Sequence, residues 1–254
     1  MTGYFDDLNG YYEKVYVLSV TAAAKRRALF ADQFDDLNYE FFYGADKNNF
    51  SIEEVEANGT YDPKLAVQHH RYSKKMKHGE IACSWSHRMI YEDMLKKNYS
   101  RVLIFEDDAV PNPEQIKKIS EIIKEIPDDC ELLMWGWDKN GETPAGSAFK
   151  KILYHLQHSL GLLKWSHSII RNLYARPYSA NLKKAGFHDY TYAYAINRIA
   201  AEKLIKMQTP IQYIADNLLA HAATTGVVNS YIVYPAVFLH DSLPDGTHRD
   251  SYIR

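Results

Sequence analysis

The sequence predicts an α/β fold built on a mostly parallel central sheet. Three observations support this prediction: short runs of apolar β-forming residues recur along the chain, segments with helical periodicity separate them, and one run ends in three consecutive carboxylates. With 254 residues the chain can bury a sizeable core, and no repeat, low-complexity tract or linker divides it. We therefore expect a single domain over residues 1–254.

The chain opens with a strand, a helix and a second strand. Residues 14–18 are a run of β-formers, and residues 22–34 have helical character with Thr21 as the expected N-cap. Residues 39–43 are rich in aromatic side chains, which favour a second strand. This order begins a parallel sheet. Residues 44–78 carry few periodic signals and predict short helices and loops.

A long amphipathic helix is expected over residues 79–97. Its apolar face would gather Cys83, His87, Ile90 and Met94, which follow one another at i, i+4, i+7 and i+11. His87 is therefore either a hydrogen-bonded core residue or a working residue of a site.

The central strand, residues 101–105, runs directly into Glu106, Asp107 and Asp108. Three neighbouring anions repel one another, so they need full solvation or a bound cation. Alternation along the strand would place Glu106 and Asp108 on one side and Asp107 on the other. Carboxylate oxygens suit magnesium or manganese better than zinc, and ligand sites in open α/β sheets lie at carboxyl ends of strands. The alternative is an acidic turn without a ligand.

A basic insert follows a helix expected over residues 113–126 and a buried strand over residues 131–137. Residues 143–188 contain seven lysines and arginines and no aspartate or glutamate, while their apolar residues keep helical spacing. This predicts a basic amphipathic helix, or a helix pair broken at Gly161. Such an insert can lie on an anionic membrane surface, act as a lid, or pack on the domain with a solvated face.

Expected strands and helices follow one another again in the rest of the chain. We expect a strand over residues 190–196, a helix over residues 199–207 and a second helix over residues 216–223. A last extended segment is expected over residues 231–239, with an interruption at Pro235.

Composition excludes several classes of protein. The net charge of -2 provides no global basic field for nucleic acid. Cys83 and Cys130 lie inside regular segments, so we expect no disulfide framework and a reducing compartment. Neither a signal sequence nor an apolar run of membrane-spanning length is found. We therefore expect a cytoplasmic protein, or one attached to a membrane only at its surface.

Short motifs occur in a defined order over most of the chain. They are Leu18-Ser19-Val20 with Arg26-Arg27, Tyr43-Gly44-Ala45-Asp46, the helix start at residues 79–87, Glu106-Asp107-Asp108, the block at residues 191–198 and Ile214-Ala215-Asp216. Together they resemble glycosyltransferase family 25, which includes galactosyltransferases of bacterial lipooligosaccharide. One departure is Tyr190, which stands where the family has glycine.

The resemblance implies a GT-A-type, Rossmann-like α/β/α sandwich and transfer of a hexose, galactose or glucose, from a UDP-sugar to a hydroxyl. It implies a divalent metal, Mn²⁺ or Mg²⁺, held by Asp108 with Glu106 or Asp107 assisting. His240 would be a further ligand, or else a surface or capping residue.

Donor-binding residues are implied in the same way. Ser19 and Asp46 match positions at the ends of the first two strands, where a nucleotide would lie. One of Arg26 and Arg27 would reach the donor phosphates or uracil, and the other would face solvent. His87 and Asp107 are further donor-side candidates.

An inverting transfer needs a base, and Asp216 is the candidate, with a helix N-cap as a compatible alternative. The implied acceptor is a lipooligosaccharide or another glycan, reached by the basic insert at the inner face of a bacterial inner membrane. Two other functions stay open. One is a metal-dependent phosphoester hydrolase, and the other is an inactive protein that binds nucleotide sugars or glycans.

Overall fold

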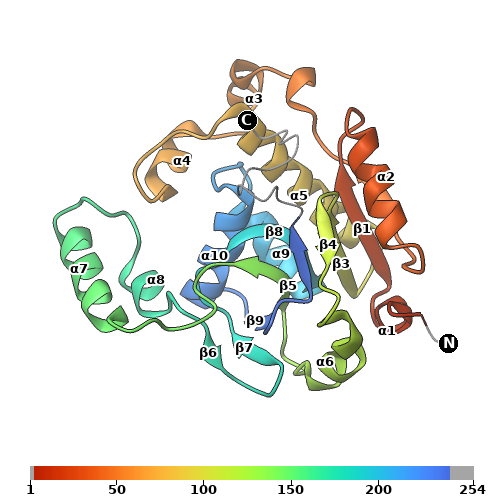
Figure 1. Ribbon diagram of the computed structural model, residues 1–254. Coiled ribbons are helices and arrows are strands. Elements are labelled where there is room, and N and C mark those ends of the chain that lie inside the picture. Colours follow the sequence, from red (N-terminus) through yellow and green to blue (C-terminus); the bar gives the residue numbers. More distant parts are fainter. Residues whose placement is uncertain (1–2, 241–254) are drawn as a thin grey trace.

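The computed structural model describes residues 3–240, and its centre is a mixed eight-stranded sheet (Figure 1). The strand order is β2-β1-β3-β8-β5-β9-β7-β6. Strands β7 and β8 run opposite to the other six, so the predicted mostly parallel sheet is confirmed. The strands are β1 (Lys14–Ser19), β2 (Glu40–Tyr43), β3 (Arg101–Glu106), β5 (Leu132–Asp138), β6 (Arg176–Pro177), β7 (Leu182–Lys184), β8 (Asp189–Asn197) and β9 (Ser230–Val233).

Helices cover both faces of the sheet and complete an α/β/α sandwich (Figure 1). Side chains alternate along β3, so Leu103 and Phe105 enter one core while Val102 and Ile104 enter the other. The first core is closed by α1 (Asp6–Tyr11), α2 (Ala24–Gln33) and α6 (Ile119–Glu125), and the second by α5 (His78–Lys96), α9 (Arg198–Met207) and α10 (Ala215–Thr225). This arrangement confirms the predicted α/β/α sandwich.

The remaining helices lie outside the sandwich, except η2, which leads directly into α6 and places Ile116 in the first core. They are η1 (Lys47–Asn49), α3 (Ile52–Ala57), α4 (Pro63–His69), η2 (Ile116–Lys118), α7 (Ser147–Ser159) and α8 (His167–Arg171). Every helix within residues 3–240 is too short or too polar to span a lipid bilayer.

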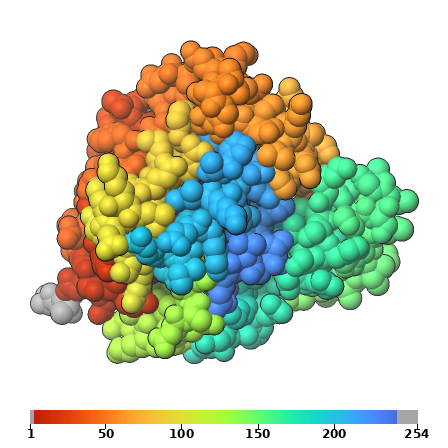
Figure 2. Space-filling view, turned by 180° about the vertical axis from the view of Figure 1, so that it is seen from behind, coloured from red at the N-terminus to blue at the C-terminus, as the bar shows by residue number. Residues whose placement is uncertain are grey.

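The basic insert forms a lobe beside the sandwich, seen as a separate bulge in Figure 2. Helices α7 and α8 confirm the predicted pair, and Gly161 between them adopts a φ of +72°. The end of the insert differs from the prediction, because β6 and β7 form a hairpin that joins the edge of the sheet.

The predicted start of the first long helix is wrong. Helix α2 begins at Ala24, and its N-cap is Ala23 rather than Thr21. Arg27 explains the late start, because its guanidinium binds the backbone carbonyls of Val20 and Thr21 and holds them in the preceding loop.

The extended segment expected over residues 231–239, with its interruption at Pro235, forms two strands. Strand β9 joins the main sheet, whereas β10 (Phe238–His240) pairs with β4 (Ala109–Pro111) in a separate two-stranded sheet. The pairing sets His240 opposite Ala109, the residue that follows the three carboxylates.

Gly136 allows β10 to reach this position. A Cβ atom there would lie 2.3 Å from Cε2 of Tyr192 and 2.8 Å from the carbonyl oxygen of Phe238. The N–H of Val237 donates to the carbonyl of Trp135 at 3.0 Å, which ties the two segments together. Any larger residue at this position would therefore push β10, and His240 with it, away from the sheet.

We predict that Gly136→Ala lowers the free energy of unfolding by about 1–3 kcal/mol, since the new methyl group overpacks this crossing. The matched control is Gly10→Ala, at an exposed site in α1 where a Cβ meets nothing within 4 Å. That change should raise the free energy by roughly 0.5–1 kcal/mol through helix propensity. Urea unfolding measures both, and equal effects of the two variants would contradict the prediction.

Candidate active site

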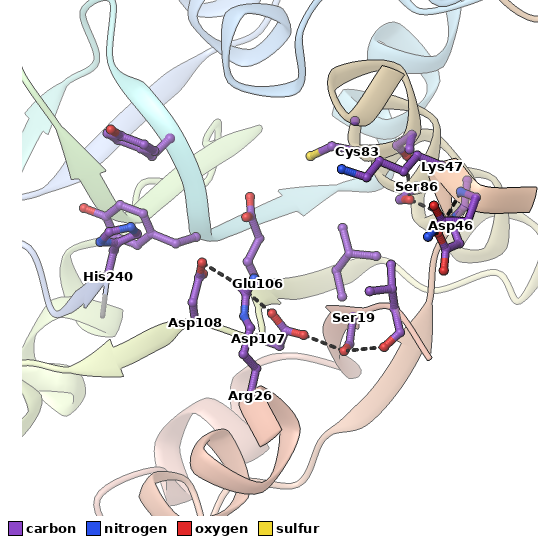
Figure 3. Close-up of a pocket in the computed structure, with 18 residues that line it drawn as sticks. Ser19, Arg26, Asp46, Lys47, Cys83, Ser86, Glu106, Asp107, Asp108 and His240 are labelled. Carbon is purple, nitrogen blue, oxygen red and sulfur yellow. Dashed lines mark hydrogen bonds and ion pairs between the residues drawn. The ribbon is translucent and has the colours of Figure 1, made fainter. Parts of the chain in front are cut away.

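A pocket of about 990 Å³ opens at the carboxyl ends of β1 and β3 (Figure 3). Its other walls come from the loop after β2, the first turns of α5, the start of β8 and the end of β10. Of the ten site residues predicted from the sequence, seven line it: Ser19, Arg26, Asp46, Glu106, Asp107, Asp108 and His240. The other three, Arg27, His87 and Asp216, lie behind its walls.

Arg26 bridges two of the three carboxylates at the end of β3. Its Nη2 lies 2.6 Å from Oδ1 of Asp107 and 2.5 Å from Oδ2 of Asp108. Ser19 Oγ donates a hydrogen bond of 2.5 Å to the other oxygen of Asp107. The expected alternation is therefore not observed, because the strand ends at Glu106 and a turn places both aspartates against one guanidinium.

Glu106 faces a different set of partners, on α5 and β8. It accepts a hydrogen bond from the Thr191 hydroxyl, and its Oε1 lies 3.5 Å from Nε2 of His87. His87 is 1% exposed, and its Nδ1 lies 2.8 Å from the hydroxyl of Tyr194, which lies 2.8 Å from that of Tyr91. Burial opposes ionisation of Glu106, but the hydrogen bond and charge of His87 hold its pKa below the usual value. His87 is thus a hydrogen-bonded core residue that orients a pocket carboxylate.

The electrostatics of Asp108 point to a cation. Burial, and then repulsion by Glu106, raise its pKa to about 7, although Arg26 opposes the shift. The pKa of Asp107 is also raised, chiefly by burial. Oδ1 of Asp108 is buried and accepts no hydrogen bond from any residue in the described range 3–240. A buried carboxylate oxygen without a donor fits a metal ligand.

His240 places an imidazole ring on the wall of the same pocket. Strand pairing holds it next to the acidic turn, and its ring centroid lies 5.6 Å from that of Tyr190 and 5.9 Å from that of Tyr192. In Figure 3 it lies on the side of the pocket where Asp108 is found. Carboxylate oxygens with one imidazole fit Mn²⁺ or Mg²⁺, so the residues present suit the implied ion.

A second set of donors shares Glu106. In residues 3–240 one group of three potential metal ligands lies close together, namely Cys83, His87 and Glu106, with ligand atoms within 4.8 Å of one another. Burial, and then the charge of Glu106, raise the pKa of the Cys83 thiol well above its usual value, so the sulfur is neutral. Sequence reasoning placed Cys83 on the apolar face of α5 but missed its place in the pocket wall.

The two arginines after β1 have different roles. Arg26 enters the pocket, as expected for one of them. Arg27 does not face solvent, and that expectation is wrong. It binds the carbonyls of the loop after β1, donates to Ser19 Oγ at 3.2 Å, and its guanidinium lies over the ring of Tyr43 at 5.2 Å. It braces the loop that carries Ser19.

The loop after β2 contributes Asp46 and a residue that the sequence did not reveal. Asp46 accepts hydrogen bonds from the N–H and the side-chain amide of Asn48, both at 2.9 Å, and so shapes this wall as an N-cap of η1. Lys47 lines the pocket from the same loop (Figure 3). Its position directly after Asp46 was the only available signal.

Asp216 lies just behind the pocket, in the first turn of α10. The N-cap of this helix is Ile214, so the capping interpretation of Asp216 is wrong. Its carboxylate instead accepts hydrogen bonds from the N–H of Asn217 at 2.6 Å and of Tyr190 at 3.3 Å. Burial, followed by the charge of Asp189, raises its pKa to about 6. The group is therefore ionised at neutral pH but close to a protonated state.

Tyr190 connects Asp216 with the pocket. It lines the pocket and has a φ of +69°, in the left-handed region that a bulky residue rarely adopts. Such strained backbone persists where surrounding structure holds it, often at functional sites. Here it turns the N–H toward Asp216 while the ring stays among the rings of Tyr192 and His240.

Comparison with known proteins places this chain in one protein family. Residues 12–219 match the model of glycosyltransferase family 25 (LPS biosynthesis protein). A glycosyltransferase 25 family member of Aedes aegypti is 29% identical over 127 residues, which cover 49% of this chain and 20% of that protein. A putative glycosyltransferase of Haemophilus influenzae is 32% identical over 122 residues, covering 46% and 39%. The chain thus matches well under half the length of these relatives.

Two solved structures resemble the model over most of its length. One is a glycosyltransferase involved in glycosylation of the major capsid of PBCV-1, with a TM-score of 0.40 and 11% identity, covering 89% of this chain and 93% of that one. The other is galactosyltransferase LgtC in complex with donor and acceptor sugar analogs, with a TM-score of 0.37 and 12% identity, covering 93% and 90%.

The environment of Asp216 generates a prediction about stability and pH. Because its pKa of about 6 in the folded protein exceeds the value near 3.9 of an unfolded chain, its protonation stabilises the fold at low pH. That stability is lost as the pH rises from about 4 to about 7. Asp216→Asn, which cannot ionise, should therefore gain roughly 1–3 kcal/mol relative to wild type between pH 4.5 and 7.5.

Urea unfolding at both pH values measures this gain. Asp128→Asn, at an exposed carboxylate far from the pocket, is the matched control and should give the same difference from wild type at both values. A constant difference for Asp216→Asn as well would show that Asp216 is not held in the folded protein as described.

Proposed function

Because the chain belongs to glycosyltransferase family 25, we propose that it transfers a hexose, galactose first and glucose second, from a UDP-sugar to a hydroxyl of a glycan acceptor. The observation that carries this proposal is the buried, unpartnered oxygen of Asp108 beside Arg26 in a pocket at the strand ends. Such a pocket suits a diphosphate and its counter-ion. The acceptor would be a lipooligosaccharide or another lipid-linked glycan at the cytoplasmic face of a bacterial inner membrane.

The donor would lie across the ends of β1 and β3. We propose that Ser19, Asp46 and Lys47 contact its nucleotide part, since they line the wall next to the ends of the first two strands. Asp107 and Arg26 would face the diphosphate, with Arg26 in place to donate to its oxygens. His87 would act through Glu106, which it orients, and Arg27 through the loop that carries Ser19.

Asp108, Glu106 and His240 would hold the divalent ion, Mn²⁺ or Mg²⁺. When bound, such an ion neutralises the charge that develops on the diphosphate as it leaves. The protein's own contribution is to keep the three ligands beside the donor. Arg26 restrains Asp108 through one oxygen, which leaves the other directed away from the guanidinium.

Asp216 is the proposed base. In an inverting transfer the acceptor hydroxyl attacks the anomeric carbon from the face opposite the diphosphate, and a carboxylate takes its proton. A pKa of about 6 keeps Asp216 ionised at neutral pH while leaving it basic enough to accept that proton. Since Asp216 lies behind Tyr190, we propose that the acceptor enters on the side of Tyr190 and α10.

The metal site generates a prediction about donor binding. Calorimetric titration with UDP-galactose and with UDP should show binding in the presence of Mn²⁺ that a chelator abolishes. Asp108→Asn should weaken this binding by roughly tenfold or more, because it removes a charged ligand. Asp128→Asn keeps the pocket intact and should bind as wild type does.

Binding of UDP-galactose without metal would contradict the assignment of the metal ligands. If neither UDP-galactose nor UDP binds, the donor carries another nucleotide. Release of inorganic phosphate from phosphoesters without a sugar acceptor would favour the hydrolase. Donor binding without transfer to any of a broad acceptor panel would favour a binding protein.

The base assignment generates a prediction about rate and pH. The value of kcat/KM should fall below pH 6 as Asp216 becomes protonated. Asp216→Asn should reduce the rate by about 100- to 10,000-fold, the usual contribution of a general base. Its matched control is Asp189→Asn, which removes a charge that raises the pKa of Asp216. That variant should keep the plateau rate and shift the acid limb to lower pH. Near-normal turnover by Asp216→Asn would refute the assignment.

A further inference from the structure

Helix α7 has its apolar side turned outward. Surface helices normally direct the apolar stripe toward the core. Here the stripe is open to solvent, and no residue of α7 is buried. We call this stripe the α7 face, and its members, with their exposed fractions, are Phe149 (74%), Ile152 (66%), Leu153 (43%), Leu156 (56%) and Leu160 (64%).

Specific contacts fix this orientation from the inner side of the helix. Tyr154 accepts a hydrogen bond of 3.1 Å from Arg71, whose guanidinium lies 3.9 Å from the ring centre of Trp165. His155 Nδ1 lies 2.8 Å from Nδ1 of His167, and Lys151 donates to the carbonyl of Arg171 at 2.7 Å. Rotating the helix to bury its apolar stripe would break all of these contacts.

The core of the lobe forms without α7. Its buried members come from the loop after α7, from α8 and from the segment just before β8. They include Leu163, Trp165, Ile169 and Phe187. Tyr154 alone of α7 packs against them. The lobe therefore leaves the α7 face uncovered even though its own packing is complete.

The charged lysine, arginine, aspartate and glutamate side chains of the insert that carries the α7 face are all positive. Residues 143–188 carry seven of the chain's 30 lysines and arginines and none of its 32 aspartates and glutamates. Lys150 is exposed on α7, and Lys164 and Arg171 are exposed nearby. An exposed apolar stripe flanked by cations matches a surface that is apolar inside and anionic at its boundary.

We propose that the α7 face docks the protein on an anionic lipid surface, with its apolar side chains in the headgroup–acyl boundary and its cations at the headgroups. The insert leaves the sheet after β5, rejoins its edge through the β6–β7 hairpin, and ends at residue 188, two residues before Tyr190 of the pocket. Figure 1 shows α7 at the outer edge of the lobe. Docking there would bring the pocket toward the membrane without covering it.

A second copy of the chain is a poorer occupant. A symmetric pairing of two α7 faces would bring two groups of cations together, and no acidic residue of the insert would balance them. A lipid surface supplies the missing negative charge. This argument does not depend on the proposed transferase activity.

The test is co-sedimentation of the full chain with vesicles. Wild type should bind phosphatidylcholine vesicles that contain phosphatidylglycerol. Binding should weaken with pure phosphatidylcholine vesicles, and also at 1 M salt, where the Debye length falls to about 3 Å. The combination Phe149→Ser, Ile152→Ser and Leu156→Ser should weaken binding by roughly tenfold or more. The matched control, Leu29→Ser with Ile199→Ser and Val227→Ser, changes comparably exposed apolar residues elsewhere and should bind as wild type does.

A charge series separates the two contributions. Lys150→Gln and Lys164→Gln should each weaken binding by about fivefold. Lys25→Gln and Lys75→Gln, at exposed sites outside the lobe, should not. Circular dichroism checks that each variant is folded.

Failure of wild type to bind anionic vesicles at low salt would overturn the proposal, as would equal binding by the α7-face and control combinations. A dimer in sedimentation velocity that the α7-face combination abolishes, without vesicle binding, would assign the face to a second copy instead. None of these outcomes involves turnover, so they are separate from a failure of the transferase proposal.

Discussion

The bridge from Arg26 to Asp107 and Asp108 is the interaction on which the functional end of this structure depends. A buried strand that ends in three carboxylates is unstable without positive charge nearby. Arg26 provides this positive charge through ion pairs of 2.6 and 2.5 Å. It lies on α2, which packs against the first core of the sheet. The bridge is incomplete, however, because one oxygen of Asp108 accepts no hydrogen bond from any residue of the described range. The site thus holds its acids together and still leaves one buried carboxylate oxygen without a donor, as the proposed metal site requires.

A second layer of support lies behind the acids. His87, Thr191, Tyr194 and Tyr91 form a hydrogen-bonded chain that ends on Glu106. Buried polar networks of this kind restrict the orientation of the group at their end. The same strand end therefore has two differently supported acids, one aspartate restrained by an arginine and one glutamate restrained by a histidine.

Acidic and basic residues are distributed unevenly between the sandwich and the insert. Acidic residues are confined to the sandwich and the segments around it, and they include the whole pocket cluster, whereas the insert is purely basic. The lobe also exposes the apolar residues that the sandwich would bury. An acid-lined pocket and a cationic, apolar face thus occupy neighbouring parts of one molecule. This separation fits an enzyme whose small donor is soluble and whose acceptor is anchored in a membrane.

The sequence by itself determined the α/β class and the main strands and helices, and seven of the ten site residues that it predicted do line the pocket. It did so because each depends on local signals: apolar runs, helical spacing and acids at a strand end. Only the tertiary structure decided the rest. The turn after Glu106 regrouped the acids, the crossing at Gly136 let β10 set His240 opposite Ala109, and the packing of Tyr154 turned α7 outward. Periodicity shows that a helix has an apolar face but not which way it points, because contacts between distant segments decide that direction.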